Sequence, residues 1–304
     1  MTSNDSENNG TRMLSLLPPL RAGKAAAPSL QELRLAANRA MEASEHAPGV
    51  SIRSRAVGGV ACVVCSVANA RGTIVHAHGG GFRLGSSSGW ATFGSQLAAA
   101  CGLDVVMPEY GLAPEHPFPS ALHEVGRAYV ELAAESAHSA RLLLSGDSAG
   151  GALAMSLALA AGAAGIAPAA LILFSPWLDL TLQSSTFASR AQTDAFFSRT
   201  SAEAAAAMYL QGWPATDTLA SPRFAALTHA PHTLILASGA EVLLGDSLDM
   251  AKALALAGKP VDLHIFPEQP HDWPVLARNT GAARRSFEIA QKFTQRICAR
   301  GGDI

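Results

Sequence analysis

From residue 73 onward, short apolar runs alternate with longer segments in which apolar residues recur every three or four positions. Short apolar runs are typical of buried strands, and the wider spacing is typical of helices that bury one face. The pattern predicts strands at 73–78, 103–107, 142–144, 169–174, 233–237 and 261–266, and helices at 89–100, 120–134, 247–257 and 282–298. Strands that alternate with helices form a mostly parallel sheet with helices on both faces, so the predicted fold class is α/β.

The N-terminal part of the chain follows a different pattern. Its first ten residues are polar, and we expect them to form a frayed tail. Residues 29–41 are predicted to form a short helix. Two β-rich runs, 50–57 and 60–67, flank Gly58-Gly59, and a glycine pair between two such runs predicts a hairpin.

One apolar run raises the question of a membrane span. Residues 150–174 contain no charged residue and exceed the length of about 18 residues that a spanning helix needs. Gly162, Gly165 and Pro168 interrupt the run, which favours a helix followed by a strand. Because a buried helix and a buried strand have the same apolarity without any lipid, we expect no membrane span.

The chain length and one irregular segment bear on domain organisation. A chain of 304 residues is long enough for one large domain or two small ones. Residues 183–228 break the alternation of strands and helices, since they are polar at first and then helical around 203–209. We interpret this segment as an insertion.

Composition and charge exclude several classes of protein. Apolar residues make up 49% of the chain and charged residues 15%, which excludes a disordered, highly charged chain. The formal net charge is −2, so no strong positive field favours nucleic acid or an anionic membrane as a partner.

The cysteines and the N-terminal residues predict a cytoplasmic location. The polar, acidic N-terminus lacks the basic and apolar regions of a secretory signal. Four cysteines are too few for a disulfide scaffold, so we expect Cys62, Cys65, Cys101 and Cys298 to be free thiols. Cys62 and Cys65 have no second Cys or His pair at ligand spacing, and no metal site is predicted.

A candidate nucleophile follows the strand at 142–144. The residues there are Gly146-Asp147-Ser148-Ala149-Gly150, and a helix begins directly after them. This Gly-x-Ser-x-Gly motif between a strand and a helix is typical of a nucleophile elbow, whose serine lies on a strained turn. The alternative is a glycine-rich turn without catalytic function, because the motif alone occurs by chance in many proteins. The strand–turn–helix context favours the enzyme.

A second glycine-rich motif, His78-Gly79-Gly80-Gly81-Phe82, follows the strand at 73–78. Its glycines allow backbone N–H groups to turn toward a shared point, where Gly80, Gly81 and Ala149 could hold an oxyanion. One such donor contributes about 10²–10³ in rate. An ordinary loop is the alternative. The sequence lacks the glycine patterns of phosphate-binding loops.

These two motifs, together with the segments 108–119 and 175–180, resemble the hormone-sensitive-lipase-like branch of the α/β-hydrolase esterases, of the bacterial carboxylesterase type. The resemblance runs from about Thr73 to the C-terminus. It implies an α/β-hydrolase fold with a helical cap, a Ser-His-acid triad, no cofactor, and short- to medium-chain esters as substrates. The implied domains are 1–47 (N-terminal tail and cap helices), 48–182 with 229–304 (catalytic core) and 183–228 (cap insertion).

In this family the triad residues occur in the chain order serine, acid, histidine. His271 lies just after the strand at 261–266, where the family's histidine lies, and it is preferred over the nine other histidines; His264, within that strand, is expected to be packed. Glu241 takes the place of the family's aspartate. Asp246 is the alternative acid, although we expect it to cap the next helix.

One position departs from the family pattern. Gly111 stands where the family usually has an arginine that resembles a member of a structural ion pair. Its absence leaves Glu115 in need of another partner, which puts local packing in doubt more than catalysis.

The sequence therefore predicts a serine carboxylesterase that acts on a small-molecule ester through Ser148, His271 and Glu241. Two alternatives stay open. The same triad could hydrolyse lactones, carbamates or activated amides, and the same fold could serve as a non-catalytic receptor for a small ligand. A homodimer is one assembly that the sequence allows.

Overall fold

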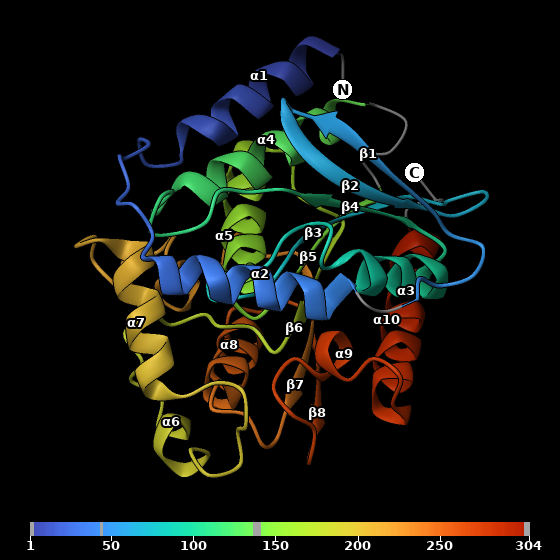
Figure 1. Cartoon of the computed structure of the whole chain (residues 1–304). Coiled ribbons are helices and arrows are strands. Elements are labelled where there is room, and N and C mark those ends of the chain that lie inside the picture. Colours follow the sequence, from blue (N-terminus) through green and yellow to red (C-terminus); the bar gives the residue numbers. More distant parts are fainter. Residues whose placement is uncertain (1–2, 43–44, 136–140, 301–304) are drawn as a thin grey trace.

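A computed structural model describes residues 3–42, 45–135 and 141–300 of the chain (Figure 1). Its centre is an eight-stranded sheet with the order β1-β2-β4-β3-β5-β6-β7-β8. The strands are β1 (Ser51–Val57), β2 (Val60–Ser66), β3 (Thr73–Ala77), β4 (Asp104–Pro108), β5 (Leu142–Asp147), β6 (Ala170–Phe174), β7 (His232–Ser238) and β8 (Val261–Phe266). From β4 to β8 all neighbours are parallel, whereas β2 is antiparallel to both β1 and β4.

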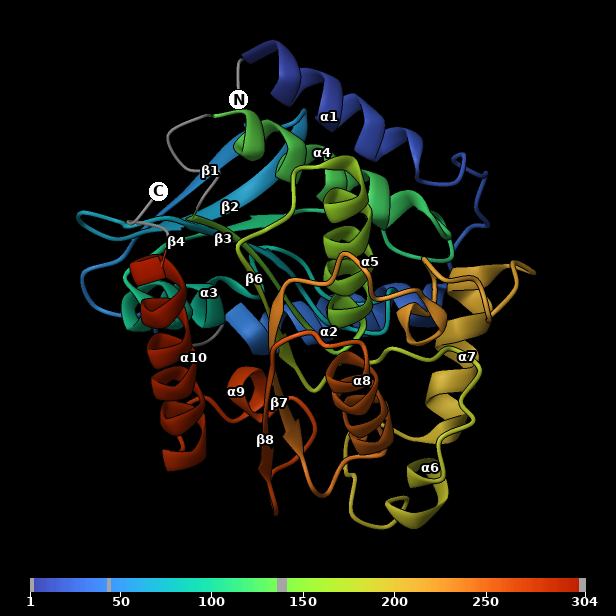
Figure 2. The same cartoon turned by 180° about the vertical axis from the view of Figure 1, so that it is seen from behind.

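Helices cover both faces of the sheet, as Figures 1 and 2 show. The helices are α1 (Ser3–Ser15), α2 (Pro28–Glu42), α3 (Ala91–Cys101), α4 (Ser120–Ala134), α5 (Ala149–Ala164), α6 (Thr186–Ser189), α7 (Arg199–Leu210), the 3₁₀ turn η2 (Pro222–Phe224), α8 (Leu244–Leu256), α9 (Trp273–Leu276) and α10 (Gly281–Arg300). Helices α3 and α10 pack on one face, and α4, α5 and α8 pack on the other. Each face has its own hydrophobic core. The predicted α/β class and mostly parallel sheet are confirmed.

The long apolar run is buried in the core. Its first half forms α5 and its second half forms the central strand β6, and every residue of β6 is buried. Among the described residues, no helix is both long and apolar enough to cross a bilayer. The apolarity of α5 and β6 therefore reflects their burial within the protein.

The N-terminal residues correct one expectation. Helix α1 begins at Ser3, where a frayed tail was expected, and packs against α4 and α5. Met13 and Leu17 are buried four residues apart, and Gly10 lies so close to α4 that a Cβ there would be 2.3 Å from Val130. A helix with few apolar anchors can dock in this way because a glycine permits close approach.

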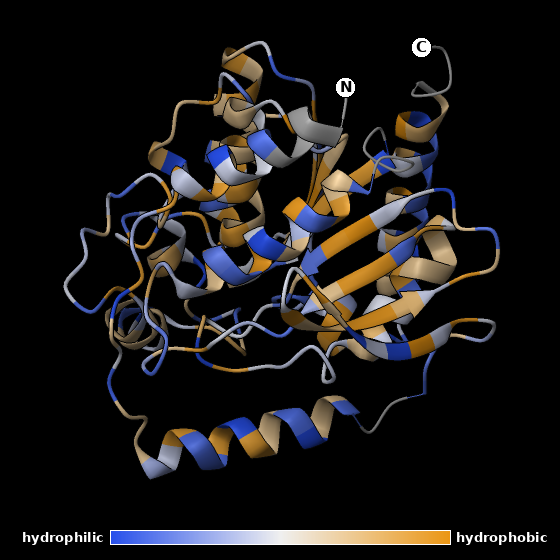
Figure 3. Cartoon of the chain, turned by 90° about the horizontal axis from the view of Figure 1, so that it is seen from above, coloured by the Kyte–Doolittle hydropathy of each residue, from blue (hydrophilic) through white to orange (hydrophobic). Residues whose placement is uncertain are grey.

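Helix α2 crosses in front of the sheet and begins beside the end of α7 (Figure 1). Arg21, which precedes α2, donates hydrogen bonds to the carbonyl oxygens of Leu210 (2.9 Å) and Gln211 (2.8 Å) at that end. Figure 3 shows hydrophilic and hydrophobic residues alternating along α2, as expected for a helix with one packed face. Segments far apart in the sequence thus meet near the C-terminal ends of the parallel strands.

Candidate active site

Ser148 lies in the sharp turn between β5 and α5. Its backbone is strained, with φ 50° and ψ −119°. A Cβ at Gly146 would lie 2.1 Å from the carbonyl oxygen of Gly150, and a Cβ at Gly150 would lie 2.0 Å from that of Ala77. Both positions therefore require glycine, as the nucleophile-elbow motif predicts.

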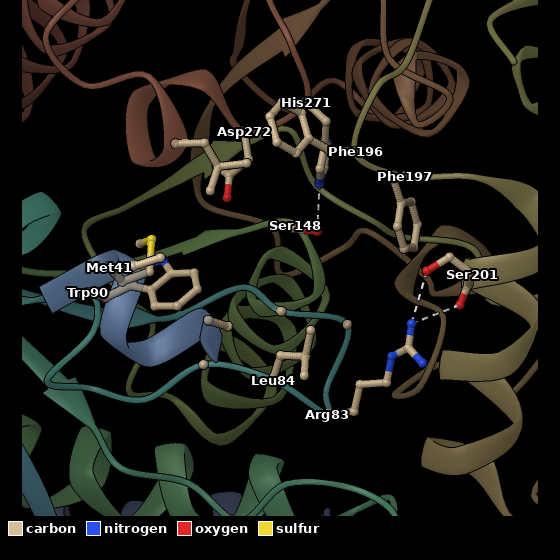
Figure 4. Close-up of a pocket in the computed structure, with 16 residues that line it drawn as sticks. Met41, Arg83, Leu84, Trp90, Ser148, Phe196, Phe197, Ser201, His271 and Asp272 are labelled. Carbon is tan, nitrogen blue, oxygen red and sulfur yellow. Dashed lines mark hydrogen bonds between the residues drawn. The ribbon is translucent and has the colours of Figure 1, made fainter. Parts of the chain in front are cut away.

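Ser148, His271 and Glu241 form one hydrogen-bonded chain. His271 follows β8, and its Nε2 lies 3.0 Å from Oγ of Ser148 (Figure 4). Its Nδ1 lies 2.7 Å from Oε2 of Glu241, which follows β7. The other carboxylate oxygen of Glu241 accepts a hydrogen bond from the N–H of Ser238 at 2.9 Å. The structure thus brings together the three residues that the sequence proposed as the triad.

The surroundings of His271 favour its charged form. Burial alone would lower the pKa of His271, but the hydrogen bond to Glu241 and its negative charge raise it above the usual value of 6.5. An imidazole that gains a proton in this position is stabilised by the fully buried carboxylate behind it.

Asp246, the alternative acid, is elsewhere in the fold. It lies in the first turn of α8, and its Oδ2 accepts hydrogen bonds from the N–H groups of Leu178 (2.8 Å) and Asp179 (3.0 Å). The expectation that it caps α8 is wrong, because its side chain holds the loop after β6. Burial, together with the negative charge of Asp179, raises its pKa to about 8.

Two expectations about other histidines have different outcomes. His264 was expected to be packed within its strand, but it is exposed because β8 is the last strand of the sheet. His78 is buried, and its Nδ1 lies 2.7 Å from the carbonyl oxygen of Gly79. Its ring stacks on Tyr110 at 4.2 Å, and the Tyr110 hydroxyl donates to the His78 carbonyl at 2.6 Å. His78 therefore supports the base of the glycine-rich loop.

The backbone of that loop is arranged as an anion site requires. Gly80 and Gly81 have φ values of 106° and 62°, which few residues with a side chain adopt. In the part of the chain that the structure describes, no acceptor is hydrogen-bonded to their N–H groups. Ala149 is the first residue of α5, so its N–H also lacks a helical partner. Gly80 and Gly81 line the same cavity as Ser148.

This cavity has a volume of about 340 Å³ and is mostly apolar (Figure 4). Helix α2 and the segment between β6 and β7 form part of its wall. The lining residues are Ala37, Ala40, Met41, Gly80, Gly81, Arg83, Leu84, Gly85, Trp90, Ser148, Phe196, Phe197, Ser201, His271, Asp272 and Leu276. An apolar cleft with a few polar groups is the usual form of a small-molecule site.

Sequence reasoning missed a buried polar network behind Ser148. Oδ1 of Asp147 accepts hydrogen bonds from Nε2 of His76 (2.9 Å) and from the indole N–H of Trp90 (3.1 Å). Burial would raise the pKa of Asp147, but His76 lowers it below its usual value. Burial and the negative charge of Asp147 together raise the pKa of Asp272 well above its usual value. The one sequence signal for this network is that Asp147 directly precedes Ser148 and Asp272 directly follows His271.

The chain belongs to the family of proteins with the α/β hydrolase fold, and the match covers residues 74–275. An acetyl-hydrolase from Streptomyces hygroscopicus is 33% identical over 234 residues, or 75% of this chain and 77% of that protein. An esterase from Acinetobacter venetianus is 35% identical over 203 residues, or 66% of this chain and 67% of that protein.

The resemblance to the hormone-sensitive-lipase-like branch is also confirmed. The crystal structure of EstE7, a homologue of hormone-sensitive lipase from a metagenome library, is similar with a TM-score of 0.85 and 29% identity. The similarity covers 98% of this chain and 99% of that one. The likeness thus extends over the whole α/β-hydrolase fold and beyond the motifs that first suggested it.

Proposed function

We propose that this protein is a serine carboxylesterase. The observation that carries the proposal is the hydrogen-bonded chain from Ser148 through His271 to Glu241, which opens onto a mostly apolar cavity that the glycine-rich loop at Gly80 and Gly81 also lines. In such a chain the histidine takes the proton of the serine hydroxyl, and the acid orients the histidine and stabilises its charged form. The serine is thereby activated for acyl transfer. Relatives that are named esterase and acetyl-hydrolase support the same class of reaction.

In the proposed reaction, Oγ of Ser148 attacks the ester carbonyl carbon while Nε2 of His271 takes the hydroxyl proton. The N–H groups of Gly80, Gly81 and Ala149 hold the negative oxygen of the tetrahedral intermediate. His271 then gives its proton to the leaving alcohol, which leaves an acyl group on Ser148. Water, activated by His271, hydrolyses this acyl-enzyme and releases the carboxylic acid. Glu241 stabilises the imidazolium in both halves.

The size and lining of the cavity support esters with short or medium chains. A volume of about 340 Å³ holds a small ligand, and side chains such as Met41, Leu84 and Phe197 offer apolar contact. We further propose that α2 and residues 183–228 act as a cap on a core of residues 48–182 and 229–304. Both segments contribute to the wall of the cavity, whereas α1 packs on α4 and α5.

We also propose a cytoplasmic location. All four cysteines are free thiols, and burial raises the pKa of Cys62 to about 11 and of Cys65 to about 12. Such thiols are compatible with a reducing compartment and are poor nucleophiles.

Replacement of the nucleophile tests the proposal. Ser148→Ala should lower the turnover of p-nitrophenyl acetate by about 10⁴-fold or more, because it removes the hydroxyl that forms the acyl-enzyme. Thermal unfolding and circular dichroism should match the wild type, since alanine fits the turn. Ser156→Ala, on the same helix and buried away from the cavity, is the matched control and should keep the activity. Wild-type turnover in Ser148→Ala contradicts the proposal.

A further inference from the structure

A single arginine brings positive charge into the wall of the cavity. Arg83 follows the glycine-rich loop and is half-buried, and its Nη2 donates to Oγ of Ser201 on α7 at 2.9 Å. No carboxylate among the described residues pairs with it, and its Nε and Nη1 have no acceptor there. Burial lowers the pKa of Arg83, and no neighbouring charge offsets that effect. A half-buried guanidinium that has no carboxylate partner among the described residues is suited to bind an anion.

The backbone of Arg83 is held firmly, so its side chain starts from a defined point. Its N–H donates to the carbonyl oxygen of Gly80 at 3.2 Å, and its own carbonyl accepts from Nε of Arg34 at 2.8 Å. Nε of Arg83 lies 3.9 Å from the position that a Cβ on Gly81 would occupy. Arg83 therefore lines the same cavity as Gly80 and Gly81, beside the position proposed for the carbonyl oxygen of the ester.

The other titratable groups that line the cavity do not oppose an anion. They are His271, which is neutral or positive, and Asp272. Asp272 is buried, and burial together with the negative charge of Asp147 raises its pKa well above the usual value, which favours the neutral carboxyl. The charge of Asp147 is offset by the donors His76 and Trp90, and Glu241 lies behind His271. Arg83 therefore dominates the charge of the cavity.

The two sides of the cavity differ in character. In Figure 4, Met41 and Trp90 lie on one side of Ser148, and Arg83 with Ser201 lies on the other. We propose that Arg83 is a specificity-determining residue that binds a carboxylate on one arm of the substrate, so that the preferred substrates are esters with a negatively charged arm. This inference rests on the proposed esterase function and narrows its substrate class.

Matched pairs of esters test the inference and distinguish the two arms. For the acyl arm, p-nitrophenyl hemiglutarate is compared with p-nitrophenyl valerate. For the alcohol arm, 4-carboxyphenyl butyrate is compared with its methyl ester. Each kcat/KM is divided by the rate of spontaneous hydrolysis. In at least one pair, the wild type should prefer the charged ester, and added salt should weaken that preference.

Substitution of Arg83 should remove the preference. In Arg83→Gln, the ratio of kcat/KM for the charged ester to that for the neutral ester should fall by about 10- to 100-fold, because a charged hydrogen bond is lost. The ratio for Arg83→Lys should lie between those of Arg83→Gln and the wild type, because lysine keeps the positive charge but lacks the planar guanidinium that binds a carboxylate with two hydrogen bonds. Arg199→Gln is the control, because Arg199 carries the same charge on α7 and pairs with Glu203 outside the cavity. Its ratio should equal that of the wild type.

Three results would overturn the inference. The first is a wild-type enzyme that prefers the neutral ester in both pairs, a result that needs no variant to fold. The second is an unchanged ratio in folded Arg83→Gln and Arg83→Lys. The third is a wild-type protein that hydrolyses neither ester of any pair, which contradicts the proposed esterase function as well. Turnover of neutral esters with no charge preference contradicts only the inference.

Discussion

The guanidinium of Arg34 on α2 holds both carboxylate oxygens of Glu115, at 2.6 and 2.8 Å. Arg34 also donates to the carbonyl oxygens of Ala113 (2.7 Å) and Arg83 (2.8 Å). The hydrogen bond from Arg34 is the main reason that the pKa of Glu115 lies below its usual value. Glu115 therefore has the partner that the glycine at position 111 could not provide, and it comes from a separate helix.

Loss of this contact should loosen α2 and weaken substrate binding. Arg34→Ala removes four hydrogen bonds that tie α2 to the loops at residues 83 and 113–115, and α2 supplies part of the cavity wall. We expect a loss of about 1–3 kcal/mol in the free energy of unfolding and a rise in KM that exceeds the fall in kcat. Urea unfolding and steady-state kinetics with p-nitrophenyl butyrate measure both. Arg39→Ala, at an exposed position of α2, should change neither; equal effects of the two substitutions would contradict this role.

Features encoded over a few neighbouring residues were the ones that could be predicted. Strand–helix alternation defined the sheet, because each element buries its own apolar face. The elbow around Ser148 was predictable because its Gly-x-Ser-x-Gly motif is contiguous in the sequence, and Gly146 is required by a contact within the turn itself. His271 and Glu241 could be assigned because the family's chain order limits where they lie.

Features that depend on contacts between distant segments could not be predicted. Arg34 and Glu115 are 81 residues apart, and nothing near either one indicates the other. Asp147 and Asp272 influence each other only after β5 and the loop after β8 have met. Helix α1 was missed because its polar composition concealed its buried anchor Met13 and a second one, Leu17, just after the helix.

The two candidate acids should differ sharply in their effect on rate. Glu241→Ala removes the carboxylate that accepts from Nδ1 of His271 at 2.7 Å, and kcat should fall by about 10²–10⁴-fold. Asp246→Ala removes two hydrogen bonds to the loop at 178–179, so it should lower stability while kcat stays within about tenfold of the wild type. Kinetics well below the melting temperature of each variant separate the effects. A larger loss of kcat in Asp246→Ala would move the role of triad acid to that residue.

The dependence of rate on pH should report the charge of Glu241. His271 must be neutral to accept the Ser148 proton, so kcat/KM falls as the pH drops through its pKa. Because Glu241 raises that pKa, the acidic limb of the wild type should lie above the usual value of 6.5. Glu241→Gln should move the limb to lower pH.

A nearby carboxylate provides the control for this shift. Glu268 lies on the same loop as His271 but is exposed, so solvent screens its charge. The profile of Glu268→Gln should overlay that of the wild type. If both substitutions shift the limb equally, or neither does, the direct pairing of Glu241 with His271 is not the cause of the raised pKa.

Asp246 should make the fold less stable as the pH rises. Its pKa is about 8 in the folded protein and near 3.8 in an unfolded chain. Between these values the folded protein holds a proton that the unfolded chain has released, so a rise in pH favours unfolding. Asn at this position keeps an oxygen that can accept from Leu178 and Asp179, but it does not titrate.

Asp246→Asn should therefore match the wild type in its free energy of unfolding at or below about pH 4 and become progressively more stable than it as the pH rises toward about 8. Urea unfolding at several pH values, compared pairwise, measures the difference. Asp249→Asn is the control, because Asp249 lies on the same helix but is partly exposed and pairs with Arg223. Its curve should run parallel to that of the wild type over this range. If the Asp246→Asn curve is also parallel, the carboxyl of Asp246 is already ionised at about pH 5 and the loop at 178–179 is held by a charged acceptor.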